Sequence, residues 1–177
     1  NEGYKLKSLT VTPEAPAIAG ALKGEFSVSA TKKVHFSQGN LWYGTVGDAQ
    51  TATFNFEANQ YSSASSWDAS HVSHFTWSST VEAAVGDSNS GDNLFCDESH
   101  KVSVDGGDAI YYALSTAEWQ YLFNYWDYTS DVRNGKYKWA TVNGVGGYVI
   151  APDDFTGTLQ ESYANDAELV TAGNLVF

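Results

Sequence analysis

The chain has 177 residues, of which 42% are hydrophobic and 15% aromatic, and it carries a formal net charge of −12 with a sequence pI of about 4.4. This length and composition predict one globular domain with a sizeable core and argue against a disordered chain. The acidic balance argues against nucleic acid and against an anionic membrane surface as partners, because both would repel the chain.

The sequence contains a single cysteine, Cys96, so an intrachain disulfide and a two-cysteine metal or redox site are excluded. A lone cysteine of this kind is interpreted as a small buried hydrophobic residue. Residues 1–25 have no signal-peptide pattern, the chain does not begin with methionine, and no run approaches the roughly eighteen apolar residues of a membrane span. We therefore expect a processed or partial chain whose residues do not insert into a membrane.

Residues 1–24 predict a leader strand and linker, followed by a single domain over residues 25–177. The segment SLTVTP favours a short strand at Leu9–Thr12, which Pro13 and Pro16 then end. From residue 25 onward apolar residues alternate with polar ones, as in FSVSA, KKVHFSQ, NLWYG and ATFNFEA. This period of two predicts short antiparallel strands.

Residues 57–110 are less regular and form a serine-rich stretch with interspersed aromatic residues. Stretches of this length without regular structure are often functional surfaces in compact domains. Within it, the loop GDSNSGDN offers Asp87, Asn89 and Asp92, whose oxygen atoms suit Ca²⁺, although the same residue types are ordinary in turns. We treat these three residues as a candidate calcium site and expect no other cofactor.

The pairs of ionisable residues lack the partners that metal binding or glycosidase chemistry requires. Each pair stands by itself in a polar loop or a turn, and adjacent carboxylates on an extended chain point apart. We therefore interpret these residues as solvated groups. The pairs are His71 and His74, Asp97 and Glu98, and Asp153 and Asp154.

The stretch ALSTAEWQYLFNYW predicts the main helix, over about residues 115–126. Ser115 and Glu118 have the S-x-x-E spacing of a capping box, in which each side chain accepts a hydrogen bond from the backbone amide of the other. An aromatic and apolar stripe follows at the spacing of one helical face, and we expect it to lie in the core. Glu118 is then a capping residue and not a catalytic acid. The stripe consists of Trp119, Leu122, Phe123 and Trp126.

After the helix, KYKWATVNGVGGYVI predicts a β-hairpin with a type I′ turn at Asn143–Gly144. A turn follows at Asp153–Asp154, and the final DAELVTAGNLVF ends in a strand at Phe177. Together the elements predict an α+β fold of short antiparallel strands, one main helix and long loops.

Several blocks of the sequence resemble a known group of bacterial surface proteins. The blocks are FSVSATKKVHFSQGNLWY, ANQY, LSTAEWQYLF, ATVNGVGGYVIAPDDF and LVF, and they cover roughly residues 24–177. They are similar to surface-exposed or lipid-anchored proteins of gut Bacteroidetes that contain a C-type-lectin-like domain of the formylglycine-generating-enzyme, or sulfatase-modifying-factor, type. The L-S/T-x-x-E-W helix start is the part that is shared with the wider superfamily.

The resemblance implies a C-type-lectin-like fold, an extracellular or outer-membrane location, and binding in place of catalysis. The formylglycine-generating enzymes use a pair of cysteines to bind copper, whereas Cys96 stands alone, so their activity is not expected here. Relatives of the group also continue past the LVF strand into a segment that completes the lectin-like core and carries most of the ligand-facing loops.

Exposed Trp and Tyr side chains are the best candidates for ligand contact, because their rings stack on apolar faces while nearby polar groups form hydrogen bonds. The candidates lie at strand ends or in polar loops, with core packing as the alternative for each. Trp67, which stands among serine and aspartate residues, is the strongest candidate for a surface position. The candidate ligand-binding residues are Trp67, Trp42, Tyr43 and Tyr112.

The sequence therefore predicts a non-enzymatic cell-surface binding or adhesion module that recognises a glycan or a host or bacterial surface protein through loop aromatics. One alternative is a structural subunit of a surface fibre, in which the strand at Phe177 or at Leu9–Thr12 pairs with a neighbouring molecule. The other is a degenerate enzyme of the formylglycine-generating type. An unpaired strand edge would favour the first alternative, and converging carboxylates with a bound metal would favour the second.

Overall fold

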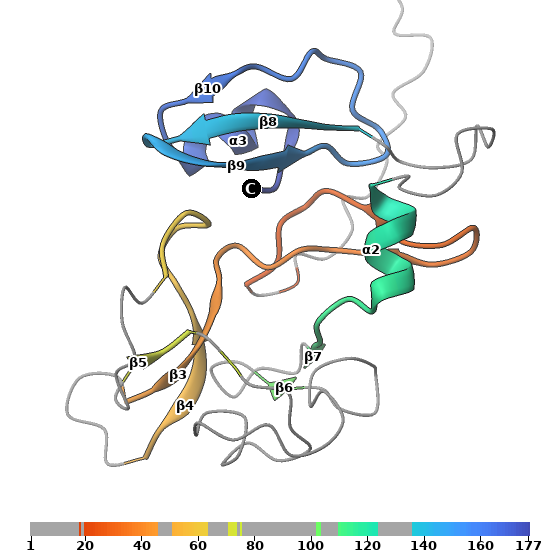
Figure 1. Ribbon diagram of the computed structural model, residues 1–177. Helices are drawn as coiled ribbons and strands as arrows, with labels where there is room; N and C mark the ends of the chain where they lie inside the picture. Colours follow the sequence, from red (N-terminus) through yellow and green to blue (C-terminus); the bar gives the residue numbers. More distant parts are fainter. Residues whose placement is uncertain are drawn as a thin grey trace, which may run out of the picture.

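The fold is described from a computed structural model of the chain (Figure 1). The structure describes residues 18, 20–45, 51–63, 71–73, 75, 102–103, 110–123 and 136–177. Within these ranges antiparallel strand pairs occur together with two helices, which agrees with the expected α+β class.

The N-terminal part of the described chain forms three small sheets. β1 pairs with β2, and β3 lies between β4 and β5, while β6 pairs with β7, all in antiparallel orientation. Alternation along β1 turns Phe26 into the core, as the period of two predicts. The bounds are β1 Phe26–Ser27, β2 Lys33–Val34, β3 Leu41–Gly44, β4 Thr53–Phe56, β5 His71–Val72, β6 Val102–Ser103 and β7 Ile110–Tyr111.

The predicted capping box starts helix α2, which spans Thr116–Leu122. The Ser115 hydroxyl accepts a hydrogen bond from the Glu118 amide at 3.3 Å, and the Glu118 carboxylate accepts one from the Ser115 amide at 2.8 Å. The helix ends earlier than expected, with Phe123 as its C-terminal cap, and Trp126 lies outside the described residues. Among the helices in the described part of the chain, none is long and apolar enough to cross a membrane.

The C-terminal part forms a three-stranded sheet in the order β10-β8-β9. β8 (Tyr137–Val142) and β9 (Val145–Ile150) form the predicted hairpin, and positive φ angles of 50° at Asn143 and 80° at Gly144 confirm its type I′ turn. β10 (Ser162–Tyr163) pairs with β8 in parallel orientation, so the expectation of antiparallel strands throughout is wrong for this pair. The connection from residue 151 to 161 carries the chain from the end of β9 to the other edge of β8, where β10 runs in the same direction as β8.

A second helix, α3 (Asp166–Gly173), stands where only a terminal strand was expected. The Asn165 side chain accepts a hydrogen bond from the Glu168 amide at 3.1 Å and caps the N-terminus. Asn174, with a φ angle of 53°, caps the C-terminus in the left-handed conformation. The expected final strand is reduced to a single antiparallel bridge between Val176 and Ile150.

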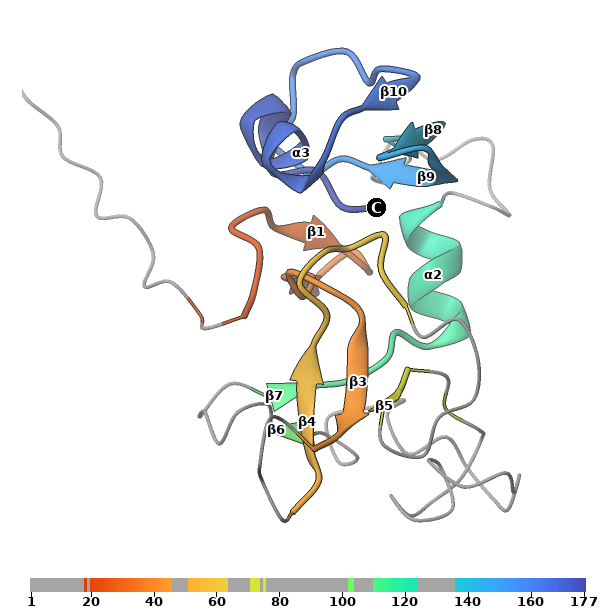
Figure 2. The same ribbon diagram turned by 90° about the vertical axis from the view of Figure 1, so that its left-hand side faces the viewer.

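Two buried clusters hold these elements together. The larger cluster lies between the β10-β8-β9 sheet and α3, which lies against that sheet in both views (Figures 1 and 2). The smaller cluster joins β1, α2 and the end of β9, and it consists of Leu22, Phe26, Leu122, Ile150 and Val176. Because α3 covers one face of the β8–β9 hairpin, the side chains of the other face are turned away from the larger cluster. The larger cluster consists of Ala140, Val142, Val149, Ala151, Tyr163, Leu169 and Leu175.

Candidate binding site

The β8–β9 hairpin presents large aromatic rings on the face that α3 leaves uncovered. Trp139 stands opposite Tyr148 in the strand register, with ring centroids 5.2 Å apart and ring planes at 87°. Tyr137 lies on the same face, two residues before Trp139. Their exposed fractions are 59% for Trp139, 48% for Tyr148 and 40% for Tyr137, so all three rings face solvent.

Helix α2 extends this run of rings. The Phe123 ring lies 4.9 Å from that of Tyr137 and 5.9 Å from that of Tyr148, with edge-to-face geometry in both pairs. The Trp119 ring stacks on Phe123 at 5.7 Å and 20°. The rings therefore form one continuous feature, which we call the aromatic surface. It consists of Trp119, Phe123, Tyr137, Trp139 and Tyr148.

The expectation that the whole helical stripe lies in the core is wrong for Trp119. Leu122 is fully buried and Phe123 is half-buried, but Trp119 is 38% exposed. The helix has only about two turns, and the buried cluster beside it reaches only Leu122 and Phe123. Trp119 instead lies over Phe36, with ring centroids 6.0 Å apart, where a pocket opens.

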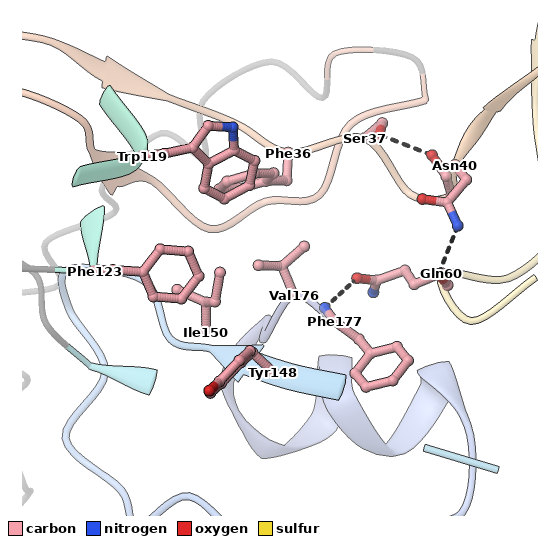
Figure 3. Close-up of a pocket in the computed structure, with 11 residues that line it drawn as sticks. Phe36, Ser37, Asn40, Gln60, Trp119, Phe123, Tyr148, Ile150, Val176 and Phe177 are labelled. Carbon is pink, nitrogen blue, oxygen red and sulfur yellow. Dashed lines mark hydrogen bonds between the residues drawn. The ribbon is translucent and has the colours of Figure 1, made fainter. Parts of the chain in front are cut away.

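The pocket has a volume of about 490 Å³ and lies between α2, β9 and the segments around residues 36–40 and 60 (Figure 3). Its size is within the range of roughly 300–1,000 Å³ that is typical of small-molecule sites. Aromatic and aliphatic side chains form most of its wall, and Ser37, Asn40 and Gln60 form a polar end. The remaining lining residues are Phe36, Gly39, Trp119, Phe123, Tyr148, Ile150, Val176 and Phe177.

Gln60 is the most constrained polar residue of the pocket, because it is only 5% exposed. Its side-chain oxygen accepts a hydrogen bond from the Phe177 amide at 2.7 Å, and its backbone amide donates to the Asp166 carboxylate at 2.8 Å. The Gln60 side-chain nitrogen has no hydrogen-bond acceptor in the part of the chain that the structure describes. An unpaired buried donor of this kind is unfavourable.

The charged groups nearest to the helix are engaged with one another. Lys32 donates a hydrogen bond to the Glu118 carboxylate at 2.8 Å, and its ammonium group lies 4.7 Å from the centre of the Tyr112 ring. Burial by itself would raise the pKa of Glu118, but the hydrogen bonds from Lys32 and Ser115 outweigh it and leave the pKa lowered. The hydrogen bond with Glu118 is the main cause that raises the pKa of Lys32. Glu118 is therefore an ionised capping group, as predicted.

No protein-family model, curated protein or solved structure matches this chain. The expected C-type-lectin-like fold therefore stays a prediction. The identification of the site rests on the geometry of the described residues.

Two of the predicted ligand-binding residues, Trp42 and Tyr43, lie in β3 and away from the aromatic surface. Because successive side chains of a strand point to opposite faces, the two rings are separated by their own sheet. The Trp42 ring stacks on the His71 imidazole at 4.1 Å and 6°, and the Tyr43 ring packs against Phe54 at 4.9 Å. Both rings are half-buried.

Tyr112, a third predicted residue, follows β7 and is half-buried beneath Lys32. Its ring face is therefore used in an intramolecular cation–π contact. Trp67, the fourth, lies outside the described residues. The structure thus does not bring the three described candidates together at one site.

The candidate calcium ligands Asp87, Asn89 and Asp92 also lie outside the described residues. Within the described ranges, no three His, Cys, Asp or Glu side chains are grouped so that they could hold a metal ion. His71 is paired with Glu57, with 2.6 Å between its Nε2 atom and the carboxylate oxygen.

Tyr137, Trp139 and Tyr148 are not among the residues predicted as ligand contacts, although their hairpin was predicted. A sequence signal for them exists. The type I′ turn fixes the register, so that the rings of KYKWATV alternate with Lys138, Ala140 and Val142. The small apolar residues Ala140 and Val142 mark the buried face of this strand, so Tyr137 and Trp139 are expected on the opposite, exposed face.

Proposed function

We propose that the chain is a non-enzymatic binding module that is displayed at the cell surface and recognises a glycan or protein ligand through exposed aromatic side chains. The observation that carries this proposal is the continuity of the aromatic surface with the pocket, which share Trp119, Phe123 and Tyr148. Contiguous exposed apolar patches on soluble domains are frequently interaction sites, and Trp and Tyr are enriched among the residues that dominate binding energy.

The C-type-lectin-like fold and the extracellular or outer-membrane location belong to the same proposal. They are supported by the sequence blocks that resemble surface proteins of gut Bacteroidetes, and one of these blocks forms the capped helix α2. The aromatic surface differs from the original expectation in two respects. It contains none of the described candidates Trp42, Tyr43 and Tyr112, and its rings stand on a helix and a hairpin and not on loops. Regular elements hold contact residues in place more rigidly than loops do.

The chemistry of the pocket supports binding over catalysis. Tyr148 is the only ionisable side chain among the lining residues. General acid–base catalysis most often uses a histidine or carboxyl group within hydrogen-bond reach of the substrate. The nearby carboxylate of Glu118 is held by Ser115 and Lys32, so the degenerate-enzyme alternative has no support in the described site.

The proposal is tested by binding of the full chain to immobilised mucin glycoprotein and to a glycan array. We expect Trp139→Ala to lower the affinity for the bound probe by about tenfold or more, as for a central aromatic contact. The matched control is Trp42→Ala, which also removes a tryptophan ring but from β3. Near-ultraviolet circular dichroism would establish that both variants keep the native fold.

The control also separates the two candidate sites. A loss of binding in Trp42→Ala with full binding in Trp139→Ala would overturn the aromatic surface as the site. Equal binding in both variants and the wild type would overturn the role of exposed aromatic residues altogether.

A structural role in assembly is the second candidate function, and it is favoured by the edge of β9. The hairpin register directs the backbone groups of Gly146, Tyr148 and Ile150 away from β8. Ile150 exchanges two backbone hydrogen bonds with Val176, at 2.7 and 2.9 Å. Within the described residues, no strand pairs with β9 beside Gly146 or Tyr148, and backbone groups of this kind can pair with a strand from a neighbouring molecule.

Light scattering over a range of protein concentrations distinguishes this second candidate. Assembly through the β9 edge should give concentration-dependent oligomers that Val145→Lys reduces, because a lysine on an edge strand opposes strand addition. A chain that remains monomeric at all concentrations would exclude self-assembly through this edge and would leave the binding function unaffected.

A further inference from the structure

We infer that the pocket beside the aromatic surface binds a neutral pyranose sugar of a glycan. This inference rests on the proposed function, because the pocket and the aromatic surface share three rings. It narrows that function from an unspecified ligand to one chemical class.

The pocket wall lacks charged side chains. None of the eleven described lining residues has a charged side chain, although 17% of the residues of the whole chain are charged and its net charge is −12. A charged ligand group placed in this pocket would lose water without gaining an opposite charge, which is strongly unfavourable. The wall therefore selects for a neutral ligand.

The pocket wall is divided into an aromatic part and a polar part. A pyranose ring has faces of C–H groups, which pack on aromatic rings, and edges of hydroxyl groups, which need hydrogen-bond partners. The rings of Trp119, Phe123 and Tyr148 supply the first kind of contact. The side chains of Ser37, Asn40 and Gln60 at the other end are neutral amide and hydroxyl groups (Figure 3). The Ser37 hydroxyl and the Asn40 amide nitrogen donate to backbone oxygens, so the side-chain oxygens of these two residues are the groups left to accept hydrogen bonds from a sugar.

Gln60 carries a hydrogen-bond donor that has no acceptor among the described residues. The Asn40 amide nitrogen already donates to the backbone oxygens of Gln60 and Ser62, at 3.1 and 2.7 Å. The Gln60 side-chain nitrogen lacks an acceptor within the described chain, and the residue is more than nine-tenths buried in the pocket wall. The close-up shows the Gln60 side chain extending from the polar end toward Val176 and Phe177 (Figure 3). This nitrogen is closed off from solvent in the structure, so a sugar hydroxyl or acetamido oxygen becomes its acceptor once the Gln60 side chain turns toward the pocket.

The geometry of the rings further restricts the form of the glycan. Trp139 and Tyr148 are nearly perpendicular, at 87°, and Tyr137 and Tyr148 meet at 74°. A flat crystalline polysaccharide needs coplanar rings for simultaneous stacking, and these rings cannot supply them. A single soluble glycan chain, with one sugar in the pocket and its neighbours on the aromatic surface, fits this arrangement.

The test is a titration of the full chain with neutral oligosaccharides, N-acetyllactosamine and maltotriose, and with the sialylated form of the first. We expect saturable binding of a neutral oligosaccharide that is at least about tenfold tighter than binding of its sialylated form. Trp119→Ala should lower this affinity by about tenfold or more, because it removes the ring that forms one wall of the pocket.

A second variant tests the polar end without removing its structural contacts. Gln60→Glu keeps an oxygen for the Phe177 amide and the backbone amide for Asp166 but replaces the unused donor. We expect weaker binding of the neutral oligosaccharide in this variant as well. If Gln60→Glu does not fold, Trp119→Ala decides the question, because its ring is partly exposed and its removal leaves the buried cluster intact.

The outcomes distinguish the inference from the function on which it rests. If mucin binds through Trp139 but neutral oligosaccharides neither bind nor compete, the sugar inference is overturned and the binding function stands. If an apolar peptide displaces the mucin and the oligosaccharides do not, the occupant of the pocket is a polypeptide, which also overturns the inference. If the folded wild-type chain binds none of these probes, both proposals fail.

Discussion

Asp153 is a single residue that ties two distant parts of the chain together. Its carboxylate accepts hydrogen bonds from the backbone amide and the hydroxyl of Ser27, at 3.0 and 2.7 Å, and it pairs with Lys33 at 3.1 Å. Burial by itself would raise the pKa of Asp153, but the hydrogen bonds from Ser27 and the contact with Lys33 outweigh it, so the pKa is lowered. The ionised carboxylate therefore stabilises the attachment of the β1–β2 pair to the segment that follows β9.

The sign of this pKa shift predicts how stability depends on pH. A carboxyl group whose pKa is lower in the folded chain adds stability above its unfolded pKa and loses it as the pH falls through the folded pKa. Asp153→Asn should lower the free energy of unfolding at neutral pH by about 1–2 kcal/mol. This is less than the roughly 3 kcal/mol that a hydrogen bond to a charged group can contribute, because asparagine keeps one acceptor oxygen. The difference from the wild type should shrink between about pH 5 and pH 3.

Chemical denaturation at several pH values measures this difference. Asp154→Asn is the matched control, because it removes the adjacent carboxylate, which is exposed, and it should change stability by less than about 0.5 kcal/mol. If wild type and Asp153→Asn lost stability in parallel on acidification, Asp153 would not be the group responsible.

At the scale of elements, local signals decided which predictions succeeded. The capping box of α2 and the Asn143–Gly144 turn each depend on a few adjacent residues, so the sequence predicted both. Helix α3 was missed because Leu169 is its only buried residue and no apolar stripe marks it. Its capping residues, Asn165 and Asn174, were present in the sequence as weaker signals. The parallel pairing of β10 has no local signal, because it depends on where a long connection returns.

The capping box predicts a specific loss of stability. α2 has seven residues, which is too short for an isolated helix to be stable, so its end contacts and its packing must hold it. Ser115→Ala should lower the free energy of unfolding by about 1 kcal/mol, because the Glu118 amide loses its acceptor. Thr116→Ala, at the exposed next position, should leave stability nearly unchanged. Equal effects of the two substitutions on the urea midpoint would contradict a specific role for the cap.

At the scale of the whole molecule, the pocket depends on contacts between residues far apart in the sequence. Phe36, Gln60, Trp119, Tyr148 and Val176 come from separate segments, and no sequence spacing joins them. The sequence predicted ligand contact through exposed Trp and Tyr side chains, and side chains of these types are exposed on the aromatic surface, but at other positions than those predicted. The sequence did not predict which rings form the aromatic surface, because the exposure of the hairpin rings depends on which face of the hairpin α3 covers.

The contact between Gln60 and Asp166 is one of the long-range links that close the molecule around the pocket. The Asp166 carboxylate accepts the Gln60 backbone amide across 106 positions of sequence, at the start of α3. Its second oxygen is buried and has no hydrogen-bond partner within the described chain. Burial raises the pKa of Asp166, and the hydrogen bond from Gln60 offsets only part of this effect.

Asp166→Asn should therefore have a pH dependence opposite in sign to that of Asp153→Asn. A group whose pKa is raised in the folded chain contributes stability below its unfolded pKa and loses it as the pH rises through the folded pKa. Asparagine keeps an oxygen for the Gln60 amide and removes the buried charge, so the stability of Asp166→Asn relative to the wild type should increase from about pH 3 to pH 6. Urea denaturation of wild type, Asp166→Asn and Asp153→Asn in the same buffers compares the two signs directly. The opposite result, a relative stability of Asp166→Asn that falls as the pH rises, would contradict this prediction. It would mean that the surroundings stabilise the ionised Asp166 carboxylate in its contact with Gln60.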